Sequence, residues 1–167
     1  VPDLTREVEA ASIDFLATEI RASDVGTDFQ LELGDGVSRS VRIPLFGNFN
    51  VENALAALAA VTSLGVEIEH SIPALTNFRG VKRRQEIRGE ERGVTVVDDF
   101  AHHPTAVRGS LEALRGRYPA RRLVAVFEPR TNTSRRRVFQ QKYVDALRSA
   151  DRVVVLRVPE TPIYSST

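Results

Sequence analysis

VVDDFAHHPT, at residues 96–105, joins an apolar strand-like run to two carboxylates, two imidazoles and a proline that suits the start of a helix. Two further apolar runs follow, LVAVF at 123–127 and VVVL at 153–156, with helical patterns between the runs. Uninterrupted apolar runs are typical of parallel strands covered on both faces. The sequence therefore predicts an α/β unit with a mostly parallel sheet. Its strands are expected over 95–99, 123–127 and 152–158, and its helices over 104–114 and 134–148.

Upstream of this unit, apolar and polar residues alternate as they do in half-buried antiparallel strands. Residues 17–22 form one candidate strand. The segments 29–33 and 37–43 alternate on either side of Gly34-Asp35-Gly36, which predicts a β-hairpin.

Helices are expected after the hairpin. An alanine-rich segment over 51–64 predicts one helix, which Gly65 ends. Ser71 is expected to cap a second, short helix that ends near Phe78.

A basic link, RGVKRR at 79–84, marks the expected boundary between two units, residues 1–79 and 80–167. Segments 85–88 and 94–98 flank a glycine-bounded turn, so the second unit is expected to open with another hairpin. The chain is thus expected to hold a β-hairpin with helices, followed by the α/β unit.

The composition excludes several classes of protein. The 167 residues include 23 Lys and Arg, 22 Asp and Glu and no Cys, which rules out disulfide scaffolds, thiolate zinc sites and cysteine nucleophiles. A net charge of +1 and an aromatic content of 7% argue against nucleic acid as a partner, despite several arginine clusters. No apolar run approaches the ~18 residues of a membrane helix, so no membrane association is expected. Because Met is absent, we expect the chain to be a piece of a longer protein.

Polar clusters follow each strand of the predicted parallel sheet, at the edge where such sheets bind ligands. The clusters are Asp98-Asp99 with His102-His103, then Glu128-Pro129-Arg130, then Arg157 to Glu160. Three clusters in succession favour a binding site at that edge over ordinary polar loops.

The first cluster is suited to a nucleotide. Pro104 fits the first turn of a helix, whose open amides and dipole favour a phosphate, with His102 and His103 on either side. Asp99 is an acceptor that suits ribose hydroxyls. Either histidine could instead cap or pack. A metal site is disfavoured because adjacent side chains on a strand diverge, and no metal ligand is assigned.

Asn50 and Asn53 bracket the start of the alanine-rich helix. Asn50 is a good N-cap with Asn53 at the third helical position, but an amide also reads the edge of a purine. Their spacing does not decide between the two roles. The chain has neither Gly-x-x-x-x-Gly-Lys-Ser/Thr nor Gly-x-Gly-x-x-Gly, so it lacks a phosphate-binding loop of its own.

Three motifs in this order resemble the Mur ligases of bacterial cell-wall synthesis. They are Gly47-x-x-Asn50-x-x-Asn53-Ala, Gly80-Val-Lys-Arg-Arg84-x-Glu86 and the 98–105 segment. The resemblance implies that residues 1–79 end a central ATP-binding domain and that 80–167 begin a Rossmann-like C-terminal domain. Such a piece would be inactive alone. It also implies a location in the bacterial cytoplasm and contact with the remaining domains of the same chain.

The resemblance assigns roles to particular residues. Asn50 and Asn53 lie against adenine, Asp99 holds the ribose, and Arg84 and His102 reach the phosphates as the catalytic pair. His103 belongs to the same nucleotide site, while Arg130 and Asn132 face the incoming substrate. Phe49 and Phe100 depart from the His and Tyr that many relatives have, so any hydrogen bond from those side chains is lost.

The implied activity is ATP- and Mg²⁺-dependent amide formation on UDP-N-acetylmuramate. Residues 81–84 together with FEPRTNT at 127–133 look most like the family members that attach the tripeptide L-Ala-γ-D-Glu-meso-diaminopimelate during cell-wall recycling. Members that add L-alanine are the alternative. A nucleotide-binding module without catalysis is an alternative of another class.

Overall fold

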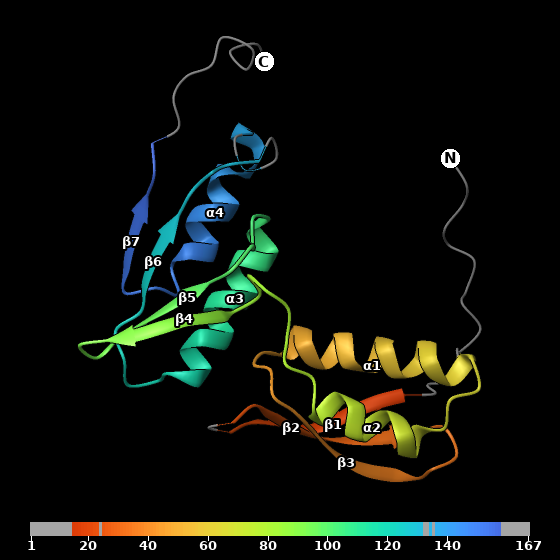
Figure 1. Ribbon diagram of the computed structural model, residues 1–167. Coiled ribbons are helices and arrows are strands. Elements are labelled where there is room, and N and C mark those ends of the chain that lie inside the picture. Colours follow the sequence, from red (N-terminus) through yellow and green to blue (C-terminus); the bar gives the residue numbers. More distant parts are fainter. Residues whose placement is uncertain (1–14, 24, 132–133, 135, 158–167) are drawn as a thin grey trace, which may run out of the picture.

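The computed structural model describes residues 15–157 except 24, 132–133 and 135, and it contains two units joined by a linker (Figure 1). The first unit consists of β1 (Phe15–Ala22), β2 (Thr27–Leu33), β3 (Ser38–Ile43), α1 (Asn48–Ser63) and α2 (Ile68–Thr76). The second consists of β4 (Glu86–Glu91), β5 (Val94–Asp98), α3 (Pro104–Arg117), β6 (Val124–Phe127), the 3₁₀ turn η1 (Arg137–Phe139), α4 (Gln140–Leu147) and β7 (Arg152–Val155). No helix in the described part of the chain is long and apolar enough to cross a membrane.

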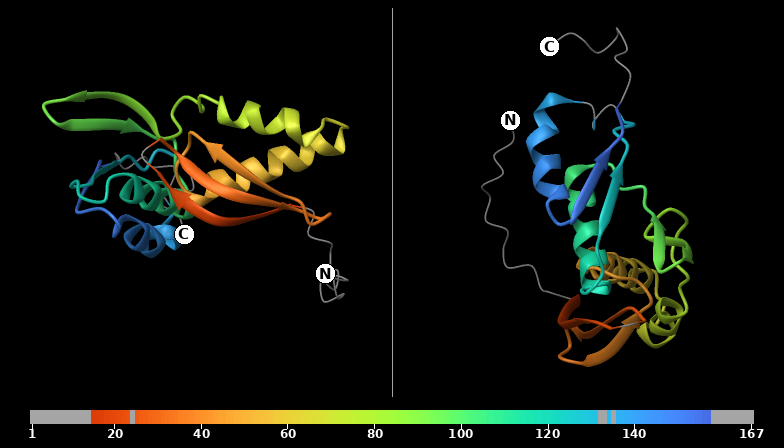
Figure 2. Two further views of the ribbon diagram at one scale, coloured as in Figure 1. Left: turned by 90° about the horizontal axis from the view of Figure 1, so that it is seen from below. Right: turned by 90° about the vertical axis from the view of Figure 1, so that its left-hand side faces the viewer.

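The first unit is an antiparallel sheet in the order β1-β2-β3, with α1 running above it (Figures 1 and 2). The predicted hairpin is confirmed, with Phe29 paired to Val41 and Gly36 in the left-handed turn at φ 80°. Side chains on one face of β2 and β3 pack against α1 and α2. This core is formed by Phe29, Leu31, Val41, Ile43, Val51, Ala54 and Leu58.

α1 begins three residues before the predicted start, after Gly47, so Asn50 lies inside the helix and its capping alternative is wrong. Gly65 ends the helix as predicted, because it takes φ 85° and its amide bonds the Thr62 carbonyl. α2 also begins earlier than expected, after Glu67. Ser71 therefore lies inside α2, where its hydroxyl donates to the Glu67 carbonyl at 3.2 Å instead of capping.

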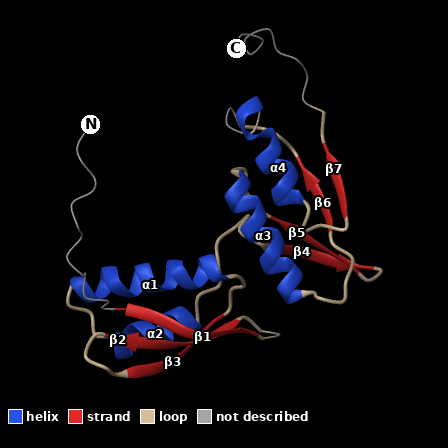
Figure 3. Ribbon diagram, turned by 180° about the vertical axis from the view of Figure 1, so that it is seen from behind, coloured by secondary structure: helices blue, strands red, loops and turns tan. Residues whose placement is uncertain are grey.

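In the second unit, α3 and α4 pack on one face of the parallel pair β6 and β7 (Figure 3). The buried residues of this core are Val107, Leu111, Tyr143, Ala146 and Leu147. Within the helix expected over 134–148, the structure forms α4, preceded by the 3₁₀ turn η1.

The parallel sheet is smaller than the sequence predicts. β5 pairs with β4 as an antiparallel hairpin, and among the described strands it joins neither β6 nor β7. The expectation that both faces of the apolar strands are covered is also wrong here: Val126 is 68% exposed and Val154 is 51% exposed. The reason is that both helices lie on the same face, and no other described element reaches the opposite one.

Asp151, directly before β7, is bonded to the last part of α3 and to the residue before β6. Its carboxylate accepts hydrogen bonds from the Arg115 guanidinium and from the Leu123 amide, each at 2.7 Å. These two donors, the arginine first, hold the pKa of Asp151 below its usual value. The interaction therefore fixes α3 against the loop that leads into β6.

The two units meet where the loop before α1 and the first turn of α1 contact α3 between Gly109 and Arg117. The Arg117 guanidinium lies 4.1 Å from the centre of the Phe46 ring. Gly47 lies so close to α3 that a Cβ placed on it would be 2.7 Å from the Ala113 Cβ. A Cβ on Gly109 would be 3.4 Å from the Phe49 ring, so glycines on both sides of the interface allow the close approach.

We predict that Gly47→Ala destabilises the protein by about 2–4 kcal/mol, because it adds steric overlap at the interface to a left-handed backbone at φ 96°. Gly36→Ala is the matched control, since Gly36 is also left-handed but has nothing within 4 Å of the added atom. It should cost about 1 kcal/mol. Urea unfolding of the intact protein measures both values, and equal losses would contradict a steric role of the interface.

We also predict that Asp151→Asn lowers stability near neutral pH and that this loss shrinks in acid. A lowered native pKa means that the carboxylate contributes its full stability above its unfolded pKa and loses it as the pH falls through the native value. The unfolding midpoints of wild type and variant should therefore converge below about pH 4. A constant difference between pH 7 and pH 3 would contradict this assignment.

Candidate functional site

Asp99, directly after β5, is the centre of the hydrogen bonding at the predicted site. Its Oδ1 accepts the Ala101 amide at 2.7 Å. Its Oδ2 accepts the Gln85 amide at 3.1 Å and the Ser110 hydroxyl at 2.8 Å. One carboxylate thus holds the linker, the turn after β5 and helix α3 together. Most of its acceptor capacity is directed at the protein itself.

The linker arginines gather on one aromatic ring. Arg83 lies 5.2 Å and Arg84 lies 5.7 Å from the centre of the Phe100 ring, within the range of a cation–π contact. The Phe100 amide also donates to the Arg83 carbonyl at 2.7 Å. Arg84 is therefore placed beside the turn that carries the two histidines.

The backbone of this linker is strained. Arg83 and Gln85 both adopt left-handed conformations, at φ 58° and 51°, although neither is glycine. The Nε2 atom of Gln85 is buried and has no hydrogen-bond partner in the described part of the chain. Strain and an unpaired buried polar atom cluster at functional segments in many proteins.

The two histidines have different partners. The Nδ1 atom of His102 lies 3.1 Å from the Phe100 carbonyl oxygen. Because a carbonyl only accepts, Nδ1 carries the proton and Nε2 is the nitrogen left for a ligand. His103 caps α3, since its Nδ1 accepts the Thr105 amide at 3.4 Å, and its ring contacts Phe139 edge to face. The capping alternative thus applies to His103.

Pro104 is the first residue of α3, as expected. The helix start is less open to an anion than the sequence suggests. Proline has no amide hydrogen, the Thr105 amide is used by His103, and the Val107 amide bonds the His103 carbonyl. In this first turn, only the Ala106 amide has no hydrogen-bond partner among the described residues.

Asn50 and Asn53 lie in the first turns of α1. The Asn50 side chain donates to the Phe46 carbonyl at 2.8 Å and so holds the loop that enters the helix. Asn53 is exposed and bonds no described residue. Contact between the units is made by Phe46, Gly47 and α3, and no described hydrogen bond or ring contact joins either asparagine to Asp99 or to the histidines.

The exits of β5 and β6 are brought together, although the strands do not pair. The Tyr143 hydroxyl donates to the His102 carbonyl, and the Tyr143 ring lies 5.1 Å from that of Phe127, the last residue of β6. Arg130 follows this exit, is exposed and forms no ion pair with a described residue. Asn132 and Glu160 lie outside the described residues.

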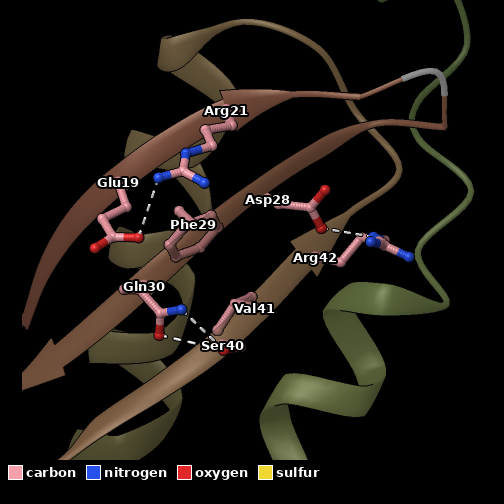
Figure 4. A pocket seen from close by; sticks show the side chains of 8 residues that line it. All are labelled: Glu19, Arg21, Asp28, Phe29, Gln30, Ser40, Val41 and Arg42. Carbon is pink, nitrogen blue, oxygen red and sulfur yellow. Dashed lines mark hydrogen bonds and ion pairs between the residues drawn. The ribbon is translucent and has the colours of Figure 1, made fainter.

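Two hollows of the surface lie away from these residues. A shallow depression of about 390 Å³ on the outer face of the first sheet contains two ion pairs, Glu19 with Arg21 and Asp28 with Arg42 (Figure 4). An apolar groove of about 360 Å³ lies between α1 and α2. No predicted site residue lines either hollow.

A protein-ligated metal does not fit the described residues, because they contain no group of three or more His, Asp or Glu side chains able to hold one.

Three residues that organise the site were missed at the sequence level: Ser110, Tyr143 and the aromatic platform Phe100. Ser110 and Tyr143 lie at core-facing positions of α3 and α4, where nothing marks a polar role. Phe100 was noted only as a departure from tyrosine. Its contact with two arginines depends on the path of the linker.

Two family models match the chain. The first, described as Mur ligase middle domain, matches residues 4–61, and the second, described as Mur ligase, glutamate ligase domain, matches residues 83–165. Together they account for most of the sequence and leave residues 62–82 between them.

Among curated relatives, the UDP-N-acetylmuramate–L-alanine ligase of Roseiflexus sp. strain RS-1 is 40% identical over 84% of this chain and 31% of its own. The UDP-N-acetylmuramate–L-alanyl-γ-D-glutamyl-meso-2,6-diaminoheptandioate ligase of Escherichia coli K12 is 42% identical over 73% of this chain and 27% of its own. The chain thus spans about a third of the length of these relatives.

Solved structures similar to this chain are also Mur-type ligases. The UDP-N-acetylmuramate–alanine ligase of Thermotoga maritima aligns with a TM-score of 0.73 and 28% identity, over 85% of this chain and 31% of that one. The MurF ligase of the same organism, solved with ADP, aligns with a TM-score of 0.68 and 25% identity over 86% of this chain and 33% of its own. These neighbours confirm the α/β architecture.

We predict that Asp99→Asn destabilises the linker, since an amide offers one acceptor oxygen where three donors now converge. The expected loss is about 1–3 kcal/mol, against about 1 kcal/mol for Ser110→Ala, which removes one donor. Urea unfolding gives the global values, and hydrogen exchange at the Gln85 and Ala101 amides gives the local ones. Unchanged exchange at both amides in Asp99→Asn would contradict the central role of this carboxylate.

Proposed function

Because the chain belongs to the Mur ligase family, we propose that it is part of an ATP-dependent ligase that forms an amide on UDP-N-acetylmuramate. The observation that carries this proposal is the match of the middle and C-terminal domain models, in this order, to residues 4–61 and 83–165. We place the domain boundary at 79/80, so that the arginines of the linker lie at the junction. The small soluble substrates of this reaction suit a bacterial cytoplasm.

L-Alanine is the acceptor that we propose. The Roseiflexus relative and the Thermotoga neighbour are both named as L-alanine- or alanine-adding ligases, which supports this choice over the tripeptide expected from the sequence. The tripeptide stays as the second candidate, because the Escherichia coli relative that bears that name is 42% identical to this chain. A binding module without catalysis is the weaker alternative, because these relatives and the structural neighbour are all named as ligases.

In the proposed reaction, the lactyl carboxylate of the muramyl group takes the γ-phosphoryl group of ATP, and the amine of the acceptor then displaces phosphate. ATP brings Mg²⁺ with it. The role of this chain is to supply charge and orientation: Arg84, held on Phe100, stabilises the phosphoryl group in transfer. His102 donates from its Nε2 to the same group in the doubly protonated form of its ring, because Nδ1 already donates to the Phe100 carbonyl. Asn53 is open to the adenine.

The remaining assignments follow the same scheme. Asp99 binds the ribose with the acceptor capacity that its three protein donors leave. Asn50 and His103 act mainly through the loop and the helix that they hold. Arg130 grips the carboxylate of the acceptor, together with Asn132. Because neither of the two surface hollows lies at these groups, we expect the rest of the protein to supply walls for the site.

The test is an assay of ADP release by the intact protein with UDP-N-acetylmuramate and ATP, with L-alanine or the tripeptide as acceptor. We expect turnover with L-alanine. Turnover with the tripeptide alone would replace the proposed acceptor by the second candidate, and no ADP with either would overturn the ligase assignment.

Arg84→Ala should lower kcat by about 100-fold or more with little effect on KM, as expected for a group that acts on the phosphoryl transition state. Arg148→Ala, at the exposed residue directly after α4, is the matched control.

A further inference from the structure

Tyr143 is a buried polar side chain to which neither the proposed reaction nor the family motifs give a role. It lies in the first turn of α4 and is only 6% exposed. Its ring packs against Phe127 with 5.1 Å between ring centres, and its hydroxyl donates to the backbone carbonyl of His102. The side chain therefore contacts the exits of two strands that form no hydrogen bonds with each other.

The carbonyl that Tyr143 binds belongs to the peptide between the two histidines. When the orientation of that peptide is fixed, the Cα–Cβ bonds of both histidines have defined directions. The His102 ring also bonds the Phe100 carbonyl, and the His103 ring caps α3 beside Phe139. One hydroxyl of α4 thus orients the turn that we assign to the nucleotide.

The ring of Tyr143 acts on the other strand exit. Phe127 is the last residue of β6, and the chain runs directly from it into 128–131. That segment carries Arg130, which we assign to the acceptor. The hydroxyl and the ring therefore serve different sides of the same site.

We propose that Tyr143 is a positioning residue of the ligase, which aligns the His102–His103 turn through its hydroxyl and the β6 exit through its ring. This inference rests on the proposed function. Burial raises the pKa of the Tyr143 hydroxyl, which keeps it protonated and able to donate over the pH range of enzyme assays.

The competing explanation is structural: a buried phenol needs an acceptor, and the His102 carbonyl is within reach. Tyr143→Phe separates the two, because it keeps the ring and removes only the hydroxyl. Thr27→Val is the matched control, since Thr27 is 2% exposed and also donates its hydroxyl to a backbone carbonyl, that of Leu45 at 2.7 Å, in the first unit. Both variants lose one buried hydrogen bond and should lose similar stability.

In the intact ligase, we expect Tyr143→Phe to raise KM for ATP and Kd for ADP about fivefold, the effect of one hydrogen bond of ordinary strength. KM for the acceptor should stay within about twofold, because the ring still supports the β6 exit. Tyr143→Leu, which removes the ring as well, should raise the acceptor KM too. Thr27→Val should leave all three constants unchanged.

The outcomes are distinguishable. If wild type releases ADP but Tyr143→Phe has the same KM and Kd values as Thr27→Val, the hydroxyl only completes a buried hydrogen bond. The inference is then wrong. An equal rise in both KM values for Tyr143→Phe also overturns it, because the two parts of the side chain would then not act separately. Failure of wild type to release ADP counts against the proposed function, whereas calorimetric binding of ADP by wild type and Tyr143→Phe still tests the role of Tyr143.

Discussion

The carboxylate of Asp99 is the interaction on which the organisation of the second unit depends. It accepts hydrogen bonds from Gln85 in the linker, from Ala101 in the turn and from Ser110 on α3. Three segments between residues 85 and 110 are thus held by one acceptor with four lone-pair positions. Because this acceptor closes the turn after β5, the directions of His102 and of the linker arginines are set together.

The same constraint explains the strain beside it. Arg83 and Gln85 adopt left-handed backbone conformations that cost about 1–2 kcal/mol each. The contacts of the linker with Asp99 and Phe100 hold the strained backbone in place, and two arginines gather over one ring as a result. A linker held in this way combines a defined position for Arg84 with stored strain at the junction of the two units.

Local patterns predicted most of the elements. The errors concern contacts that a short stretch of sequence does not specify. The hairpin around Gly36 and the helix end at Gly65 depend on backbone conformations that only a few residue types favour, so the sequence reveals them. The starts of α1 and α2 were missed because Asn50 and Ser71 are good caps in isolation, whereas here they bond carbonyls of the preceding turn. The wider parallel sheet was expected because an apolar run carries no information on which strand lies beside it.

By itself, the sequence determined the order of strands and helices, the position of the basic linker and the chemical groups at the exit of β5, because each depends on residue type and on near neighbours. Only the tertiary structure decided that Asp99 is largely occupied by protein donors, that β5 pairs with β4, and that Tyr143 reaches His102 from 41 residues away. Contacts of this kind depend on how helices pack onto strands. A periodic pattern shows which face of a helix is buried, but it does not specify the atoms that meet there.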